Sequence, residues 1–166
     1  MEPRASSVAA VAAAALVLAV GAHAQARLFT AGYPYASSCP QAGDRDDVDR
    51  WKMNTCNCTS YAAWALWRNG YRIDWFVAGS MDAWNWPNVA RRHGIPSGSA
   101  ARVGAVAVWP AWGKFGHVAV VTGVHANGSF DVAEYNLPGT GPDFVFDRRT
   151  AVSPRGVTFV YVPRRS

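Results

Sequence analysis

Two cysteines lie one residue apart in the segment NTCNCTSYAAW, which begins at Asn54. Cys58 falls where a polar stretch changes into a helical pattern, with Asn57 as the predicted N-cap. The unpaired N–H groups and the positive end of the helix dipole favour a thiolate in the first turn. Because the thiolate is the nucleophilic form of cysteine, Cys58 is a candidate covalent catalyst.

A cysteine nucleophile needs a base, commonly histidine, and a group that orients that base. The chain has four histidines. His23 lies in the N-terminal segment, His93 lies at a predicted helix end, and His125 lies beside a turn. His117 differs because it follows two glycines in WGKFGH and opens a strand of small and branched residues. It is the candidate general base.

The two segments after His117 predict a β-hairpin closed by a two-residue NG loop. In that register Glu134 lies opposite Val121, and Asn136 lies opposite Ala119. Opposed residues share a face and side chains alternate along a strand, so the histidine, the glutamate and the asparagine share one face. This register puts the asparagine nearer to the histidine, although a bulge or a longer loop would change that.

Each of these residues also has a plainer interpretation. Cys58 alone fits a small buried hydrophobe or half of a disulfide, and His117 alone fits a hydrogen-bonded core histidine. A zinc pair at Cys56 and Cys58 is disfavoured, because zinc-binding thiols are usually two to four residues apart and need further ligands. The joint pattern on one face is more specific than any single member.

The elements that must position these residues follow one another in α+β order. Helices are predicted over residues 58–68 and from Ser80 to Gly94, where Pro87 kinks or restarts the second one. Strands are predicted after them, at residues 103–109, 117–126, 129–136, 143–149 and 156–163. Helices followed by antiparallel strands predict an α+β fold, with helices packed on an antiparallel sheet, rather than alternating β-α-β units.

The N-terminus has the pattern of a secretory signal peptide that is cut after Ala24. Arg4 precedes an unbroken apolar run at residues 8–20, which is shorter than the about 20 residues that span a bilayer. An uncleaved anchor remains the alternative. We therefore expect one mature domain, residues 25–166, that is secreted or lies in the cell envelope, with a periplasm included.

The net charge of +5 suits an anionic partner such as a cell-wall polymer. Nucleic acid fits less well, because an exported protein rarely meets it and the arginine pairs are scattered rather than striped. Eight tryptophans are more than so small a domain buries completely. Trp109, Trp112, Tyr33 and Tyr35 are candidates for substrate binding, although packing explains any one of them equally well. We expect a monomer, without a cofactor or a stable membrane span.

Four motifs, CTSYAAW, GAVAVW, GHVAVV and AEYN, resemble in their order the CHAP family of cysteine- and histidine-dependent amidohydrolases/peptidases. The resemblance covers roughly residues 33–163 and implies a papain-like fold that hydrolyses amide bonds in peptidoglycan. It implies Cys58 as nucleophile, His117 as base, Glu134 as the orienting residue and Asn136 as its polar companion. NlpC-type cell-wall peptidases fit less well, since they usually show Asp-Cys-Ser where this chain has Asn-Cys-Thr.

Extracellular members of that family often carry a cystine near the nucleophile. Export permits disulfides, and we expect one between Cys39 and Cys56, which leaves the third cysteine free. Some members bind calcium in the acidic stretch before the nucleophile, where this chain has Asp44, Asp46 and Asp49. The EF-hand spacing and its glycine are missing, so we expect no metal there and keep calcium as the alternative.

Three functional classes stay open at this point. The resemblance favours a cell-wall hydrolase, either an N-acetylmuramoyl-L-alanine amidase or an endopeptidase of the cross-bridge or stem. A secreted amidase or peptidase with a substrate outside the wall is the second class. A wall-binding module without catalysis is the third, and the presence of cysteine, histidine and glutamate together disfavours it.

Overall fold

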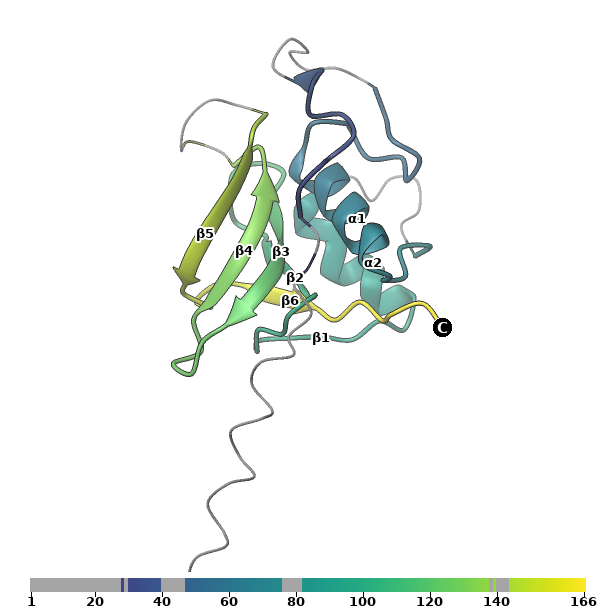
Figure 1. Ribbon diagram of the computed structural model, residues 1–166. Coiled ribbons are helices and arrows are strands. Elements are labelled where there is room, and N and C mark those ends of the chain that lie inside the picture. Colours follow the sequence, from purple (N-terminus) through teal and green to yellow (C-terminus); the bar gives the residue numbers. More distant parts are fainter. Residues whose placement is uncertain (1–27, 29, 40–46, 76–81, 138, 140–143) are drawn as a thin grey trace, which may run out of the picture.

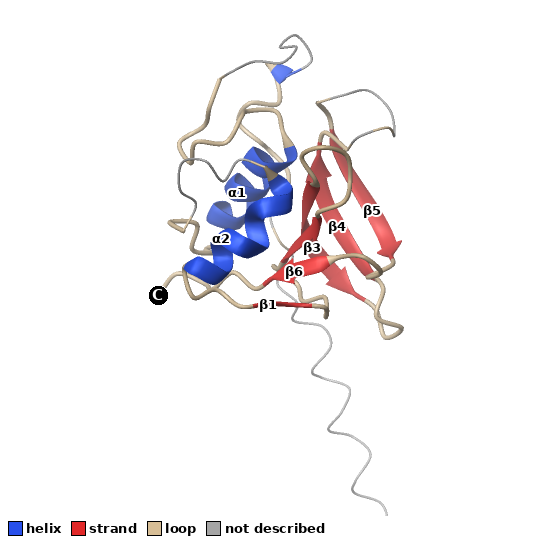
Figure 2. Ribbon diagram, turned by 180° about the vertical axis from the view of Figure 1, so that it is seen from behind, coloured by secondary structure: helices blue, strands red, loops and turns tan. Residues whose placement is uncertain are grey.

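The computed structural model of the chain describes residues 28, 30–39, 47–75, 82–137, 139 and 144–166. The predicted signal peptide, Ser80 and the aspartates at positions 44 and 46 lie outside these residues. In Figure 1 the helices stand on one side of the molecule and the strands on the other, and Figure 2 shows the same two layers from behind. The predicted α+β fold is confirmed.

Helix α1 (Cys58–Arg68) has the predicted bounds. All of its residues from 59 to 66 are buried, so the helix is covered on every side. Ala62, Ala63 and Ala65 have no exposed surface, and their small side chains let neighbouring elements approach the helix axis closely. The helix ends before Gly70, whose φ of +82° is a conformation that glycine adopts without strain.

The second predicted helix is shorter than expected and is preceded by a single 3-10 turn. That turn, η2 (Ala83–Asn85), leads into α2 (Trp86–Arg92), and Pro87 lies in the first turn of α2. Proline is tolerated there because the N–H that it lacks has no partner within the helix. Pro87 therefore belongs to a helix start, which fits the predicted restart rather than a kink.

The sheet has six strands in the order β1-β6-β2-β3-β4-β5, and every neighbouring pair is antiparallel. Its strands are β1 (Ser97–Gly98), β2 (Val106–Trp109), β3 (His117–Val124), β4 (Phe130–Tyr135), β5 (Phe146–Val152) and β6 (Thr158–Val160). The last five correspond to the five predicted strands. The two-residue strand β1 had no sequence signal of its own and pairs with the edge of β6.

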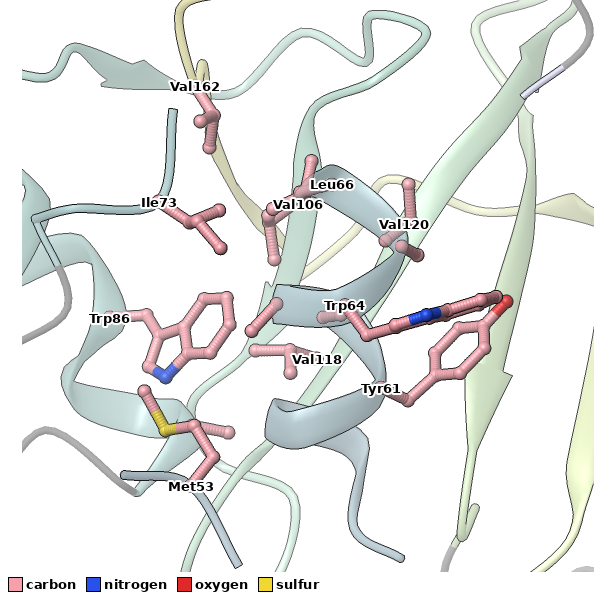
Figure 3. Packing of buried hydrophobic residues seen from close by; sticks show 14 of the residues in the cluster. Met53, Tyr61, Trp64, Leu66, Ile73, Trp86, Val106, Val118, Val120 and Val162 are labelled. Carbon is pink, nitrogen blue, oxygen red and sulfur yellow. The ribbon is translucent and has the colours of Figure 1, made fainter. Parts of the chain in front are cut away.

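Two clusters of buried side chains lie on the two faces of this sheet. The larger one joins α1 and α2 to the sheet, and Figure 3 shows Trp86 and Ile73 meeting Val106 and Val118 there. The smaller one lies on the opposite face, around Phe130 and Phe159 and their neighbours. Because residues alternate between faces along a strand, His117 points to the side of the smaller cluster while Val118 points to the helices.

The predicted register of the β3–β4 hairpin is wrong. The His125 N–H donates to the Ser129 carbonyl at 2.8 Å, so the loop has three residues rather than two. The ladder is also irregular between Val121 and Gly123, and Val121 pairs with Val132 instead of residue 134. On the His117 side of the irregularity this shift of two residues leaves His117 and Glu134 on the same predicted face, and it moves Glu134 two residues closer to the start of β3.

Residues 39 and 56 form the expected disulfide, with a Cα–Cα distance of 5.4 Å. Both cysteines are buried, and the bond joins the N-terminal segment to the turn that precedes α1. A zinc site at Cys56 is thereby excluded. Among the described residues, no helix is long and apolar enough to cross a membrane.

Replacing both Cys39 and Cys56 by alanine should lower the free energy of unfolding by about 3 kcal/mol, because the bond constrains the unfolded chain across 17 positions. Urea unfolding followed by tryptophan fluorescence measures this. Cys58→Ala is the matched control, since it removes a thiol outside the bond and should cost less. The native protein should present one reactive thiol, and a count of three would contradict the disulfide.

Candidate active site

Cys58 is the first residue of α1 and the free cysteine among the described residues, and it is half-buried. The preceding turn is held in place: the Cys56 N–H donates to the Tyr33 hydroxyl at 3.1 Å. That hydroxyl also lies 2.6 Å from the Ser60 hydroxyl, inside the first turn of the helix. Tyr33 and the disulfide together fix the nucleophile candidate at the helix N-terminus, where free backbone N–H groups gather.

His117 opens β3 and has no exposed surface. Its Nε2 lies 2.8 Å from Oε2 of Glu134, which is also fully buried. Gly116 takes a φ of +70°, and a Cβ at that position would come within 2.6 Å of the Trp84 backbone nitrogen. Only glycine fits there, so η2 approaches the chain closely just before the histidine. The pair predicted from strand alternation is thus formed, through the corrected hairpin register.

Two neighbouring side chains, Cys58 and Glu134, affect the pKa of the His117 imidazole. Burial alone would lower its pKa, but interactions with Cys58 and Glu134 outweigh the burial and raise the pKa to about 9. Because Glu134 occupies Nε2, the interaction with Cys58 is assigned to Nδ1. No hydrogen-bond partner lies within bonding distance of Nδ1 among the described residues, so the thiol acts on the ring as a near neighbour rather than through a formed bond.

Arg149 on β5 is a site residue that sequence reasoning missed. Its Nε lies 2.5 Å from Oε1 of Glu134 and its Nη2 lies 2.8 Å from Oε2. Burial by itself would raise the pKa of Glu134, but the bonds from His117 and Arg149 prevail and lower it. In the sequence Arg149 is one half of an RR pair without a functional signal, and only strand alternation along residues 146–152 distinguishes it from Arg148.

Asn136 occupies a different place from the one expected. Within the described residues, its side-chain hydrogen bonds run to Asn57 and to the Phe144 N–H, at 2.7 and 3.0 Å, rather than to His117. Asn57 is the N-cap position of α1, and its own side chain makes no capping bond. Asn136, with a φ of +52°, therefore links the end of β4 to the residue that precedes Cys58.

The aromatic candidates divide into two groups. Trp109 and Trp112 are half-buried, and their ring centroids lie 5.8 and 5.3 Å from the His117 ring. Tyr35 is half-buried and packs edge-on against Tyr33 at 5.3 Å. Tyr33 is 5% exposed and packs in the core beside the turn that precedes Cys58, so of its two interpretations packing is the one that the structure fits.

The acidic stretch contributes a turn in the part that is described. Oδ1 of Asp49 accepts hydrogen bonds from the Trp51 and Met53 N–H groups at 2.8 and 3.0 Å. Asp44 and Asp46 lie outside the described residues. Within those residues, no group of three or more His, Cys, Asp or Glu side chains is arranged to hold a metal ion.

The molecule is a papain-like α+β protein with a free cysteine at the start of its central helix and a histidine–carboxylate pair on its sheet. Its sequence matches the CHAP domain over residues 48–136, which is more than half of the chain. The chain therefore belongs to the CHAP family. The matched range contains the cysteine, the histidine, the glutamate and the asparagine discussed above, and it ends before Arg149.

Similar proteins include two secreted antigens of Staphylococcus aureus (strain NCTC 8325 / PS 47). Staphylococcal secretory antigen ssaA2 is 37% identical over 81 residues, which are 48% of this chain and 30% of that protein. Staphylococcal secretory antigen SsaA is 37% identical over 75 residues, covering 45% and 29%. The chain thus spans about 30% of the length of these relatives.

A crystal structure of an N-acetylmuramoyl-L-alanine amidase from Staphylococcus aureus has a similar fold, with a TM-score of 0.56 and 23% sequence identity. The match covers 66% of this chain and 31% of the amidase. At this level of identity the comparison establishes a shared fold.

The proton on His117 should persist to about pH 9, as NMR titration of the imidazole measures. Glu134→Gln should lower this pKa, because an amide carries no charge to stabilise the imidazolium. Since the folded-state pKa is raised, the contribution of charged His117 to stability is complete below about pH 6.5 and is lost as the pH rises through about 9. The stability gap between wild type and Glu134→Gln should narrow over that window.

Asp131→Asn is the control for this titration. Asp131 lies 2.7 Å from His125, on the far side of the hairpin, and its loss should leave His117 unchanged. A His117 pKa near the ordinary histidine value in wild type would contradict the assignment.

Proposed function

We propose that the chain is a cysteine-dependent peptidoglycan hydrolase that cleaves amide bonds by acyl transfer. The observation that carries this is the buried pair of His117 and Glu134, whose Nε2 and Oε2 atoms are 2.8 Å apart, together with the free Cys58 at a helix N-terminus, which contributes to the raised pKa of His117. A nucleophile, a base and a group that orients the base are the parts that such chemistry requires.

Because the raised pKa keeps His117 protonated, the first step starts from an ion pair in which Nδ1 of His117 holds the proton and Cys58 is a thiolate. The thiolate sulfur attacks the carbonyl carbon of the scissile amide. A C–S bond forms and the carbonyl oxygen takes up the negative charge. Backbone N–H groups at the start of α1, including that of Cys58, would stabilise this oxyanion. Glu134 keeps the imidazolium oriented while it carries the proton.

In the second step the tetrahedral intermediate collapses and the C–N bond breaks, while His117 delivers its proton to the leaving nitrogen. Water then attacks the thioester, and His117 takes a proton from it. The C–S bond breaks, the acid product leaves, and the thiolate is restored. Trp109 and Trp112, whose rings pack against His117, and Tyr35 are proposed to contact the substrate, with Asn136 holding the nucleophile's turn.

Membership in the CHAP family and the name of the protein with the similar fold, an N-acetylmuramoyl-L-alanine amidase, support a cell-wall substrate. The name of the relatives, secretory antigens, supports export. The net charge of +5 fits a wall rich in anionic polymer. The buried disulfide and the N-terminal signal pattern support export, with residues 1–24 removed and residues 25–166 acting as a single domain. An amidase or peptidase acting on a substrate outside the wall is the second candidate.

Wild-type protein should clear a suspension of purified bacterial walls, and Cys58→Ala should abolish the clearing because no nucleophile remains. Mass spectrometry of the released muropeptides identifies the bond. New N-terminal alanine indicates an amidase, and new bridge or stem-peptide ends indicate an endopeptidase. Clearing that survives in Cys58→Ala would exclude cysteine catalysis, and intact walls after treatment with wild type would favour the non-wall substrate.

Glu134→Gln should reduce kcat more than Asn136→Ala does, because Glu134 contacts His117 directly and Asn136 acts through Asn57. Steady-state turnover on solubilised wall fragments compares the two variants. Near wild-type turnover in Glu134→Gln together with inactivity of Asn136→Ala would reverse the roles assigned to these residues.

A further inference from the structure

The guanidinium of Arg149 occupies the side of the Glu134 carboxylate that His117 leaves free. Among the described residues, Oε1 accepts from Arg149 Nε, whereas Oε2 accepts from both Arg149 Nη2 and His117 Nε2. The arginine reaches this position because Arg149 pairs with Val132 across the β4–β5 ladder and so shares a face with Glu134. Two parallel bonds of this kind fix a carboxylate in orientation as well as in charge.

The same guanidinium packs against two neighbouring aromatic rings, whose centroids are 5.6 Å apart. It lies 4.8 Å from the centroid of Trp109 and 5.0 Å from that of Trp112, distances typical of cation–π contacts. These are also the two rings that pack against His117. The tryptophans therefore fix the arginine and the histidine relative to each other, and the Arg149 side chain is left 26% exposed.

We propose that Arg149 is a positioning residue: it holds the Glu134 carboxylate ionised and oriented, so that His117 presents Nδ1 to Cys58. A carboxylate whose two oxygens receive an arginine fork can only accept from the imidazole, which keeps a proton on Nε2. The nitrogen that exchanges a proton with the thiol is then Nδ1. This inference rests on the proposed roles of Cys58 and His117, and Arg149 lies outside the range that the family match covers.

Charged and titratable groups approach Glu134 from each neighbouring element. His117 lies on β3 and Arg149 on β5, where Asp147 is the direct ladder partner and accepts the neighbouring Arg148 N–H at 2.7 Å. On α1, the pKa of Tyr61 is raised mainly by burial, and the negative charge of Glu134 contributes to the increase. Within the described part of the chain, Arg149 is the permanent cation that bonds the carboxylate, and after its loss His117 is the remaining described group that opposes the effect of burial on Glu134.

Arg149→Met tests the proposal, because methionine keeps an apolar stem against the tryptophans and removes the charge and both donors. The readout is the rate at which iodoacetamide alkylates Cys58 as a function of pH, which needs no wall substrate. We expect the acid limb of that profile to move to higher pH by about one unit, and the rate on the limb to fall about tenfold at fixed pH. Arg149→Lys keeps the charge, so the acid limb of its alkylation profile should lie at the same pH as in wild type.

Arg148→Met is the matched control. Arg148 is the adjacent arginine on the opposite face of β5, where it bonds the Thr30 hydroxyl and lies over Phe146, and its loss should leave the profile unchanged. If Arg149→Met folds poorly, Arg149→Gln, which keeps a donor without the charge, should show the same shift. An Arg149→Met or Arg149→Gln profile that coincides with the Arg148→Met profile would reduce Arg149 to a structural ion pair and overturn the proposal.

Alkylation also separates this proposal from the proposed function. A shifted profile in a protein that fails to clear walls would support the positioning role and reject the substrate. If wild type clears walls but the Arg149→Met profile is unshifted, the peptidoglycan substrate is supported and the positioning role of Arg149 is rejected.

Discussion

An ionised carboxylate with no exposed surface is costly unless every lone pair is used, and Glu134 is such a group. The structure meets this constraint by surrounding it with two donors from the strands on either side, His117 from β3 and Arg149 from β5. The order β3-β4-β5 in the sheet is therefore what makes the site possible. A sheet with β4 at its edge would leave the carboxylate with one partner and water.

The second requirement is that a helix N-terminus meets that buried pair. Helix α1 is enclosed on all sides, and its alanines allow the sheet and the N-terminal segment to close around it. Tyr33 ties the turn before the helix to Ser60, and Asn136 ties Asn57 to the end of β4. The position of Cys58 is thus fixed by contacts from both the N-terminal segment and the end of β4, although Cys58 itself remains half-buried and free.

Cys56 and Cys58 have the same side chain but different environments and different bonding. Cys56 is 3% exposed, adopts a φ of +64° and is consumed in the disulfide, whereas Cys58 two residues later begins the helix. The disulfide joins this turn to the N-terminal segment without using the Cys58 thiol. An odd number of cysteines is what this division of roles requires.

The sequence alone determined the features that depend on residues close together in the chain, namely helix ends and the alternation of side chains along strands. The polar segment followed by alanines and a terminal Asn-Gly placed α1 at residues 58–68, and strand alternation placed His117 and Glu134 on one face, an assignment that survived because the register shifted by an even number of residues there. Tertiary structure decided the rest. The three-residue loop and the irregularity near Thr122 shifted β4 by two positions, so Glu134 rather than Asn136 meets the histidine. Arg149 had no signal in the sequence, because an arginine in a strand becomes the partner of a buried carboxylate only when a particular neighbour lies beside it.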